Sequence, residues 1–334
     1  MLDHFCKGRK WFLAIVAGAL GTLTAAQAGY AQGTWTPLAP VSPSPTEGMT
    51  VGGIGQVIVG AYGFSASLGG NTNQTRLYNI SSDSWSAGTP APLPARADAA
   101  SGDTTHEGFL YVIGGGNSGV ALFDLERYDP VLDAWTTLAS MNTARAGAAA
   151  AVIDDGIYVI GGRQSTGGPC SGGPYLTTVE KYDIDTNTWS PVAPLLNARS
   201  DLAAVARGGK IFVFGGCTGA ASAPSFTGEV DMYDPQTNTW TTLPSTMTTA
   251  RASLVAGHTG DKVYTIGGTT DGVSVSNVNE VYDIPSGTWS TNTATMTTAR
   301  QEAGVSSHGG KIYVVGGSTA SFGTSTAANE TFKP

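Results

Sequence analysis

Side chains that could do acid–base or binding chemistry recur at two fixed places in this sequence, and their types change from one occurrence to the next. The first place lies two residues after a recurring arginine and carries, in chain order, Asp98, Gly147, Asp201, Ser253 and Glu302. The second follows a recurring pair of glycines and carries Gly116-Asn117, Arg163-Gln164, Cys217-Thr218, Thr269-Thr270-Asp271 and Ser318-Thr319. A carboxylate and an arginine can handle proton transfer, whereas hydroxyl and amide groups suit hydroxyl-rich or peptide ligands.

A binding site must break the symmetry of a repeated unit, so the varying positions form the candidate site. We expect ligand binding by Asp98, Asn117, Arg163, Gln164, Asp201, Thr269, Asp271, Glu302 and Ser318. Among these, only Arg163, Asp201 and Glu302 are candidates for catalysis, and nothing in the sequence shows that they converge. We predict a non-catalytic site without a metal ion or a cofactor.

The recurring arginines themselves allow two interpretations. Either they form a ring that captures an anion, or they hold the scaffold together by binding neighbouring backbone or an acidic residue of an adjacent unit. The residues concerned are Arg96, Arg145, Arg199, Arg251 and Arg300. Because they recur in five units whose loops differ, we favour the scaffold role.

Other motifs give no clear sign of chemistry. His106, His258 and His308 each lie just before the second strand of a unit, and we interpret them as exposed turn residues spread around the molecule. The segment DIDTNT, residues 183–188, resembles part of a calcium loop but lacks the remaining ligands and the terminal Glu. Its counterpart DPQTNT in the next unit indicates a repeated turn. HExxH, GxSxG and GxxxxGK[ST] do not occur in the sequence, so common hydrolase and nucleotide signals are missing.

The elements that position these residues follow from a repeat of about 50 residues. Six tryptophans are separated by 50, 50, 54, 51 and 49 residues, namely Trp35, Trp85, Trp135, Trp189, Trp240 and Trp289. Between successive tryptophans the same four short segments appear, each rich in Val, Ile, Tyr or Trp and bounded by Gly, Asn, Asp or Pro. Such segments are typical of strands joined by turns, so each unit predicts a four-stranded antiparallel sheet.

These residues resemble the kelch repeat. The resemblance rests on glycine pairs at 114/115, 161/162, 215/216, 267/268 and 316/317, and on Tyr-Asp pairs at 128/129, 182/183, 233/234 and 282/283, each followed by Trp. Glu126, Glu180 and Glu280 match the family's glutamate ahead of the Tyr-Asp pair. The resemblance implies an all-β propeller of four-stranded blades around a central channel. The first unit departs from it, with Gly60-Ala61 and Tyr78-Asn79 in place of the two pairs and no arginine before its inner strand.

The two ends of the chain predict six blades. The last unit stops at NETFKP and supplies only three strands, whereas residues 34–38 have the form of a fourth strand with no first three before them. Pairing the N-terminal strand with the C-terminal blade would close the ring and remove a free sheet edge. Small residues in the inner strands suit the crowding near the axis.

The N-terminal residues are typical of a secretory signal peptide. Basic residues at positions 7–10 precede an apolar run over residues 11–23, which is shorter than the ~20 residues of a spanning helix. A membrane anchor is the alternative. We expect residues 1–28 to be removed, with cleavage after Ala28 or Ala31, and residues 29–334 to be a soluble, monomeric propeller that is periplasmic or secreted.

Charge and cysteines agree with export. Removal of residues 1–28 leaves 14 basic and 24 acidic side chains, so the net charge moves from −8 to −10 and disfavours a nucleic-acid partner. Cys170 and Cys217 then remain, in equivalent loops of successive units. We predict a disulfide between them, with two unpaired thiols as the alternative.

Three functions stay open. The first is an exported binding module for a protein, peptide or carbohydrate, which we favour; in kelch adaptors the matching loops grip peptides. The second is an enzyme similar to the sialic-acid mutarotases, which are exported six-bladed kelch propellers that hold a sugar on the same face. The third is a structural surface or matrix protein, suggested by low charge and loops rich in Thr, Ser and Gly. Galactose oxidase, a more distant relative, binds copper through tyrosines and histidines that have no evident counterpart here.

Overall fold

Each repeated unit forms one four-stranded antiparallel sheet, because its apolar segments alternate with turns that reverse the chain. The computed structural model describes residues 33–168, 170–220, 222–292, 294–320 and 323–334, and the predicted signal peptide and cleavage positions lie outside them. Among the described residues, the only helix is a single 3-10 turn, η1 (Ala66–Leu68), and no helix could cross a membrane. The prediction of an all-β protein is confirmed.

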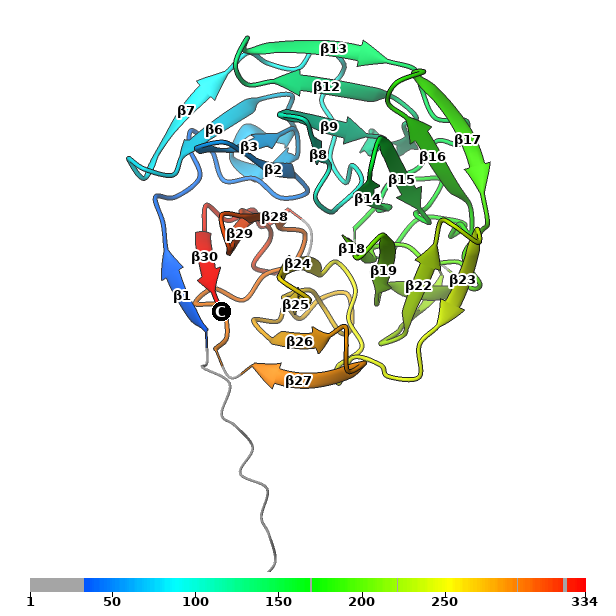
Figure 1. Cartoon of the computed structure of the whole chain (residues 1–334). Coiled ribbons are helices and arrows are strands. Elements are labelled where there is room, and N and C mark those ends of the chain that lie inside the picture. Colours follow the sequence, from blue (N-terminus) through cyan, green and yellow to red (C-terminus); the bar gives the residue numbers. More distant parts are fainter. Residues whose placement is uncertain (1–32, 169, 221, 293, 321–322) are drawn as a thin grey trace, which may run out of the picture. The chain divides into compact units, whose positions relative to one another are not determined.

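Six such sheets, the blades, are arranged around a common axis (Figure 1). Listed from the axis outward, the first three are blade 1, β2 (Thr50–Ile54), β3 (Val57–Ala61), β6 (Thr75–Asn79) and β7 (Ser84–Gly88); blade 2, β8 (Thr105–His106), β9 (Phe109–Ile113), β12 (Leu125–Asp129) and β13 (Ala134–Leu138); and blade 3, β14 (Ala149–Ile153), β15 (Gly156–Ile160), β16 (Val179–Asp183) and β17 (Thr188–Val192).

The other three are blade 4, β18 (Ala203–Arg207), β19 (Lys210–Phe214), β22 (Val230–Asp234) and β23 (Thr239–Thr242); blade 5, β24 (Val255–Thr259), β25 (Lys262–Ile266), β26 (Asn279–Asp283) and β27 (Thr288–Asn292); and blade 6, β28 (Gly304–His308), β29 (Lys311–Val315), β30 (Asn329–Lys333) and β1 (Thr34–Pro37). Three small hairpins add β4 (Phe64–Ser65) with β5 (Gly70–Asn71), β10 (Gly116–Asn117) with β11 (Val120–Ala121), and β20 (Cys217–Ala220) with β21 (Ala223–Phe226).

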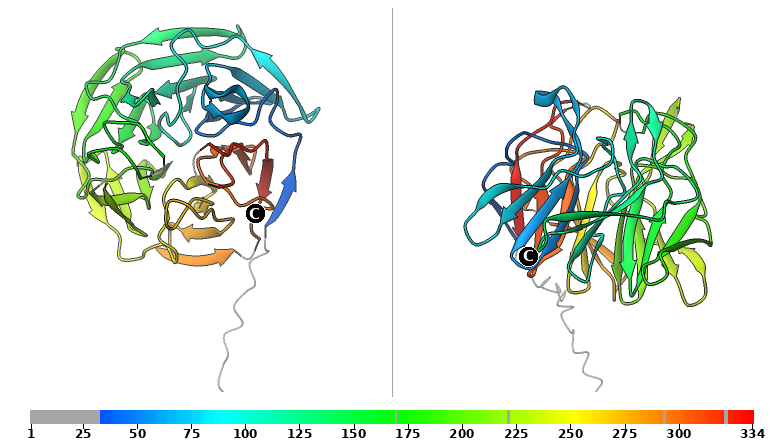
Figure 2. Two further views of the ribbon diagram at one scale, coloured as in Figure 1. Left: turned by 180° about the vertical axis from the view of Figure 1, so that it is seen from behind. Right: turned by 90° about the horizontal axis from the view of Figure 1, so that it is seen from above.

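The N-terminal strand closes the ring, as predicted. β1 pairs with β30 in a register that sets Trp35 opposite Phe332 and Pro37 opposite Glu330. Leu38 continues the pairing through its N–H, which donates to the carbonyl of Asn329 at 2.8 Å. Figures 1 and 2 show the two strands side by side from opposite sides of the ring. Six blades therefore result, and the last one contains both ends of the described chain.

The recurring tryptophans join each blade to the one before it. Within a blade, the tryptophan of the fourth strand packs on the tyrosine of the third, with ring centroids 5.2 Å apart for Tyr78 and Trp85. The indole N–H of Trp85 donates to the carbonyl of Ala39 at 2.9 Å, and that of Trp189 donates to Ala139 at 2.7 Å. Five of the six indoles donate across a blade boundary in this way, whereas the indole N–H of Trp289 has no partner among the described residues and that ring contributes by packing. Filling the wide outer part of each blade explains why the tryptophan recurs.

Small residues line the narrow inner part of the wedge. A Cβ added to Gly52 would lie 2.3 Å from Cγ2 of Thr105 in the next blade, and one added to Gly304 would lie 2.1 Å from Cγ2 of Val51. Neighbouring inner strands therefore come closer than side chains would permit. The predicted crowding at the axis is confirmed.

The alternation of the strands gives the ring two distinct faces. The loops that lead into the inner strands and the loops that follow the glycine pairs lie on one face, here called the mouth face. The turns between first and second strands, and between third and fourth strands, lie on the opposite face, here called the turn face. The two sets of varying residues in the sequence both belong to the mouth face.

Candidate functional site

The recurring arginines are part of the scaffold and are not available to an external anion. Each is at most 1% exposed and bonds a carboxylate of the third strand, in the pairs Arg96–Glu126, Arg145–Glu180, Arg199–Asp231, Arg251–Glu280 and Arg300–Glu330. Arg145 also donates to the carbonyl of Gly161 at 3.0 Å, the first glycine of its pair. The scaffold role is confirmed, but the acidic partner belongs to the same blade and not to an adjacent one. In blades 2 to 5 the guanidinium therefore joins the glycine pair to the acidic residue of the third strand, and in blade 6 Arg300 bonds Glu330 and the Val314 carbonyl.

Blade 1 has an arginine where the other blades have the third-strand acidic residue, and no acidic side chain of the described residues pairs with it. Arg76 on β6 occupies the place of the third-strand glutamate and is fully buried. Its Nη2 donates to Gln74 Oε1 at 2.6 Å and to Ser44 Oγ at 3.1 Å, so two neutral groups replace a carboxylate. Burial without an acidic partner lowers the pKa of Arg76 to about 10. The departure of the first unit from the repeat is thus a local rearrangement of the scaffold.

Two residues beyond each arginine, the chain forms a hoop around the axis. The five residues at this position and their counterpart in blade 1 have left-handed backbone, with φ between 50° and 63°: Gly48, Asp98, Gly147, Asp201, Ser253 and Glu302. Backbone hydrogen bonds join neighbours in the hoop, such as the Asp201 N–H to the Gly147 carbonyl at 2.7 Å and the Gly48 N–H to the Glu302 carbonyl at 2.8 Å. All six line a narrow pocket of about 50 Å³, here called the mouth pocket.

Arg163 is fully buried beneath this hoop and binds two of its carboxylates. Its Nη1 donates to Asp201 Oδ1 at 2.5 Å and to Ser200 Oγ at 3.0 Å, and its Nη2 donates to Asp98 Oδ2 at 3.1 Å. A Cβ added to Gly147 would lie 2.2 Å from Nη1. The hoop therefore needs a glycine in blade 3, because the guanidinium occupies the space that a side chain would take.

Two further carboxylic groups lie in the same region, and three of their four oxygens lack a donor among the described residues; Oε1 of Glu47 accepts from the Gly323 N–H at 2.8 Å. Both oxygens of Glu302 are buried and have no hydrogen-bond partner among the described residues, and the same holds for Oε2 of Glu47. Burial raises the pKa of Glu302 well above its ordinary value, and the charges of Asp98, Glu47 and Asp201 raise it further. Burial also raises the pKa of Glu47 to about 7. Arg163 thus interacts with three carboxylic groups, Asp98, Asp201 and Glu302, and Glu47 adds a fourth beside Asp98 and Glu302.

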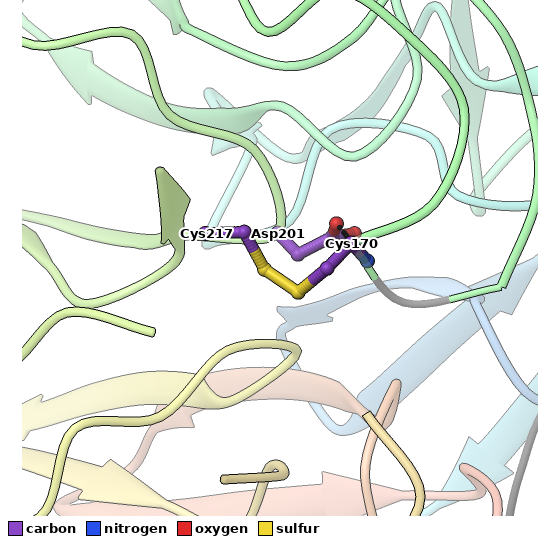
Figure 3. Close-up of side chains that lie close together, drawn as sticks. All are labelled: Cys170, Asp201 and Cys217. Atoms are coloured by element: carbon purple, nitrogen blue, oxygen red, sulfur yellow. Dashed lines mark hydrogen bonds between the residues drawn. A yellow bond between two sulfur atoms is a disulfide. The ribbon is translucent and has the colours of Figure 1, made fainter. Parts of the chain in front are cut away.

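The disulfide is formed as predicted and fixes one of these carboxylates. Cys170 and Cys217 are bonded, with their Cα atoms 5.7 Å apart. The backbone N–H of Cys170 donates to Asp201 Oδ2 at 2.9 Å, and the Tyr175 hydroxyl donates to the Cys170 carbonyl at 2.5 Å. Figure 3 shows Asp201 beside the bridge that spans blades 3 and 4. The bridge therefore fixes the loop whose backbone N–H, at Cys170, hydrogen-bonds the second oxygen of Asp201.

The structure brings together four of the nine predicted ligand-binding residues, namely Asp98, Arg163, Asp201 and Glu302. The three candidates for catalysis converge, which the sequence did not show. Glu47 and Ser200 were missed, because the first unit lacks the arginine that marks the position and because Ser200 directly precedes the position considered. The only available signal for Glu47 was its place immediately before the unit's counterpart of the varying residue.

Ser318 also reaches this cluster, because its hydroxyl hydrogen-bonds the Glu47 carboxylate. The other four predicted residues lie in mouth-face loops away from it. Thr269 and Asp271 bond within their own loop; Oδ1 of Asp271, for example, accepts from the Ser274 N–H at 2.6 Å, and these bonds lower the pKa of Asp271 to about 2. Asn117 lies in β10 and accepts from Ser118 at 3.0 Å, and Gln164 is exposed. A second cavity of about 210 Å³ adjoins Asp98 between blades 1 and 2 and is lined by Phe64, Asn71 and Thr166 among others.

The histidines were predicted to be exposed turn residues, and this was wrong. His258 and His308 end the inner strands β24 and β28 and are half-buried, because those strands continue to the turn face beside the axis. His106 ends β8, and its Nε2 lies 3.1 Å from Asp155 Oδ1. The ligand atoms of His106, Glu107 and Asp155 lie within 4.8 Å of one another on the surface.

Comparisons with known proteins agree with the repeat. Residues 164–330 match the sequence model of the KLHDC2/KLHL20/DRC7 Kelch-repeats domain, and residues 100–142 match the Kelch motif. Kelch-like protein 23 of Homo sapiens is 29% identical over 212 residues, which cover 51% of this chain and 37% of that protein. Kelch-like protein 25 of Xenopus tropicalis is 33% identical over 170 residues, 50% of this chain and 28% of that protein. The matched regions span about a third of the length of these relatives.

A solved structure shows the same fold. The structure of YjhT superposes with a TM-score of 0.72 at 19% sequence identity, covering 87% of this chain and 95% of that one. The match extends around nearly the whole ring, whereas the sequence matches cover about half of it. Together with the repeated glycine pairs, Tyr-Asp pairs and tryptophans and the six blades that they build, these comparisons show that the chain belongs to the kelch-repeat β-propeller family.

Proposed function

We propose that this protein is an exported, non-catalytic binding module whose mouth face takes a protein or peptide segment and receives a basic side chain of that segment in the mouth pocket. The observation that carries the proposal is the excess of carboxylic groups over cations at the mouth. The two terminal nitrogens of Arg163 already donate to Asp98, Asp201, Ser200 and the Gly167 carbonyl, and its Nε is buried, so it has little capacity left for an anion. Glu302 keeps two buried oxygens without a donor. An ammonium or guanidinium group would supply both the donors and the missing charge.

Exposed apolar side chains around the mouth favour a protein segment over a sugar. Most of the large apolar residues that the described chain exposes lie in mouth-face loops: Leu68, Val120, Phe123, Leu196 and Val273, each 50% exposed or more. Apolar anchors beside a charged pocket are a common arrangement at protein interfaces. Kelch-repeat domains generally mediate protein interactions, which agrees with this arrangement.

Export is supported by two observations of different kinds. The N-terminal residues have the composition of a signal peptide, and the Cys170–Cys217 bridge requires an oxidising compartment to persist. Mass spectrometry of the protein released by its native host would find a mature N-terminus after residue 28 or 31. A full-length chain retained in the cytoplasm would contradict export without affecting the binding proposal.

A peptide array tests the binding function. Peptides that combine Lys or Arg with apolar neighbours should bind, and binding should weaken when salt rises from about 0.05 M to about 0.5 M because the pairing is electrostatic. Glu302→Gln should lower the affinity of the best peptide at least about tenfold, since it removes an unpaired carboxylate without breaking a bond of the scaffold. The matched control is Asp155→Asn on the turn face, where no change is expected. Peptides that bind without any basic residue, or equal binding by Glu302→Gln, would refute the proposal.

One observation favours an enzyme as the second candidate. Asp201 is held by an arginine and a backbone N–H, whereas Glu302 in the same pocket is buried without a donor and its pKa is raised. Two carboxylic groups in contrasting environments can serve as base and acid, as epimerisation at a sugar's anomeric centre requires. Nuclear magnetic resonance of freshly dissolved sugars measures their anomer exchange. An exchange rate unaltered by the protein excludes this activity for the sugars tried.

A further inference from the structure

The inner strand of blade 2 is interrupted, and the chain before it crosses the axis. β8 has two residues, whereas the inner strands of the other five blades each have five. The segment of residues 100–104 that replaces the missing strand is here called the plug. The Ser101 N–H donates to the carbonyl of Ala148 at 3.0 Å, and the Ser101 hydroxyl donates to that of Leu202 at 3.1 Å. The plug therefore reaches from blade 2 to the segments leading into blades 3 and 4.

The sequence of the plug is adapted to this crossing. Gly102 has φ +124°, and a Cβ there would lie 2.2 Å from the carbonyl oxygen of Ala150. Only glycine combines that backbone conformation with so close an approach. Figure 1 shows the chain before β8 turning in toward the middle of the ring.

The plug separates two cavities that share no lining residue. Ser101 lines the mouth pocket, whereas Asp103 lines a second cavity of about 190 Å³ toward the turn face, here called the cup. The cup's wall consists of small apolar residues from three inner strands: Ala150, Ala151, Val152, Ala204, Val205, Ala206 and Ala256. Its polar groups are Asp103, Thr105, His258 and Ser307.

Three hydrogen-bond acceptors of the cup retain capacity for a ligand. Asp103 accepts from the Thr105 N–H at 3.1 Å and from its hydroxyl at 2.6 Å, and both bonds reach Oδ1, which leaves Oδ2. Nδ1 of His258 is buried and has no partner among the described residues. Ser307 Oγ accepts the His258 backbone N–H at 2.8 Å and keeps a second lone pair.

The charges around the cup favour a cation. Burial raises the pKa of Asp103, while its bonds to Thr105 and the nearby His258 and His308 lower it. Burial and the charge of Arg207 lower the pKa of His258, so its imidazole is neutral at neutral pH. The exposed Arg207 is itself paired with Asp261 at 2.8 Å. The lining of the cup therefore contains one carboxyl group, that of Asp103, and no lysine or arginine.

We propose that the cup binds a small aliphatic primary ammonium ion. Its N–H groups would donate to acceptors of three lining residues, Asp103 Oδ2, His258 Nδ1 and Ser307 Oγ, and its short alkyl chain would pack on the wall of alanines and valines. The cup's volume corresponds to roughly six water molecules at ~30 Å³ each, which limits the ligand to a few heavy atoms. This site is separate from the mouth pocket and does not depend on the function proposed for it.

Ligand-observed nuclear magnetic resonance with n-propylammonium tests the proposal on the whole protein. Saturation transfer should give a Kd of about 1 mM, and 1-butanol, a neutral molecule of similar size, should bind at least about tenfold more weakly. Asp103→Asn should weaken n-propylammonium at least about tenfold. Should that variant not fold, His258→Phe removes the imidazole acceptor and should weaken binding as well. Asp155→Asn, outside the cup, is the control.

Each alternative result has a definite meaning. If saturating the protein resonances gives no signal on n-propylammonium, the ion does not bind and the proposal is overturned. Equal affinity for 1-butanol would show an apolar cavity without a cation site, which also overturns it. Equal affinity of wild type and both cup variants would place the bound ion elsewhere.

Discussion

Replacing Arg163 by methionine tests whether its ion pairs with Asp98 and Asp201 stabilise the mouth face. Met has about the length of the arginine stem but leaves Asp98 and Asp201 as neighbouring buried carboxylates without their cation. Removal of one partner from a buried ion pair costs about 3–5 kcal/mol. With an unfolding entropy of about 2.1 cal/mol/K per residue over some 300 residues, 4 kcal/mol lowers Tm by about 6 °C.

The loss of stability caused by Arg163→Met should increase with pH. Burial raises the pKa of Asp98 to about 6 while the charge of Arg163 holds it down. Without Arg163 this folded-state pKa would rise further above the unfolded value, so the variant would lose more stability than wild type as pH increases. The difference in Tm from wild type should therefore be larger at pH 8 than at pH 5, as measured by differential scanning calorimetry. Adding Asp98→Asn and Asp201→Asn should recover part of the loss at pH 8.

Arg207→Met provides the matched control. Arg207 and Asp261 form an ion pair at 2.8 Å whose side chains are 40% and 58% exposed, and such a pair contributes about 0–1 kcal/mol. If Arg163→Met lowers Tm no more than this control does, or by the same amount at both pH values, the electrostatic account of the mouth is wrong.

Three further results are expected. Cys170→Ser with Cys217→Ser should lower the free energy of unfolding by about 4 kcal/mol, the chain-entropy value for a loop of 47 residues, in chemical denaturation; an unchanged midpoint would show that the bridge is dispensable. Gly147→Ala should cost about 1–3 kcal/mol in the same assay, because φ is +58° and the new Cβ would contact Arg163; a neutral effect would mean that the guanidinium moves aside. Since the folded-state pKa of Glu47 is about 7 against an ordinary 4.5, wild type should lose about 3 kcal/mol as pH rises from 4.5 to 7. Glu47→Gln should flatten that slope, and an identical pH profile would exclude Glu47 as its source.

The scaffold could be predicted from the sequence because its parts repeat. Trp85 and its counterparts fill the same outer space in each blade, and five of the six also bond the preceding blade, so their period reveals the fold. The incomplete last unit likewise predicted the pairing of β1 with β30. Such features are local to one unit or to one boundary, and a single sequence displays them several times.

The site could be predicted only in part, because it depends on features that occur once. Arg163 has no counterpart in other units, and its two carboxylate partners come from blades 2 and 4. Glu47 lies in the unit that lacks the marker arginine, and the plug replaces a strand where the pattern predicts one. The side chains converge at the axis only because the ring is closed. Spacing along the chain therefore predicts on which face of the ring a residue lies, but it does not predict which side chains it contacts.

The pairing of β1 with β30 also constrains the order of assembly. The earliest-made strand of the ring finds its hydrogen-bond partner in the latest-made one, nearly 300 residues away. Until β30 has been made, β1 has no partner in its own blade, and its backbone groups could pair with another chain. A nascent or translocating molecule must therefore keep β1 from pairing elsewhere until β30 is available. The ring then closes in a single late step.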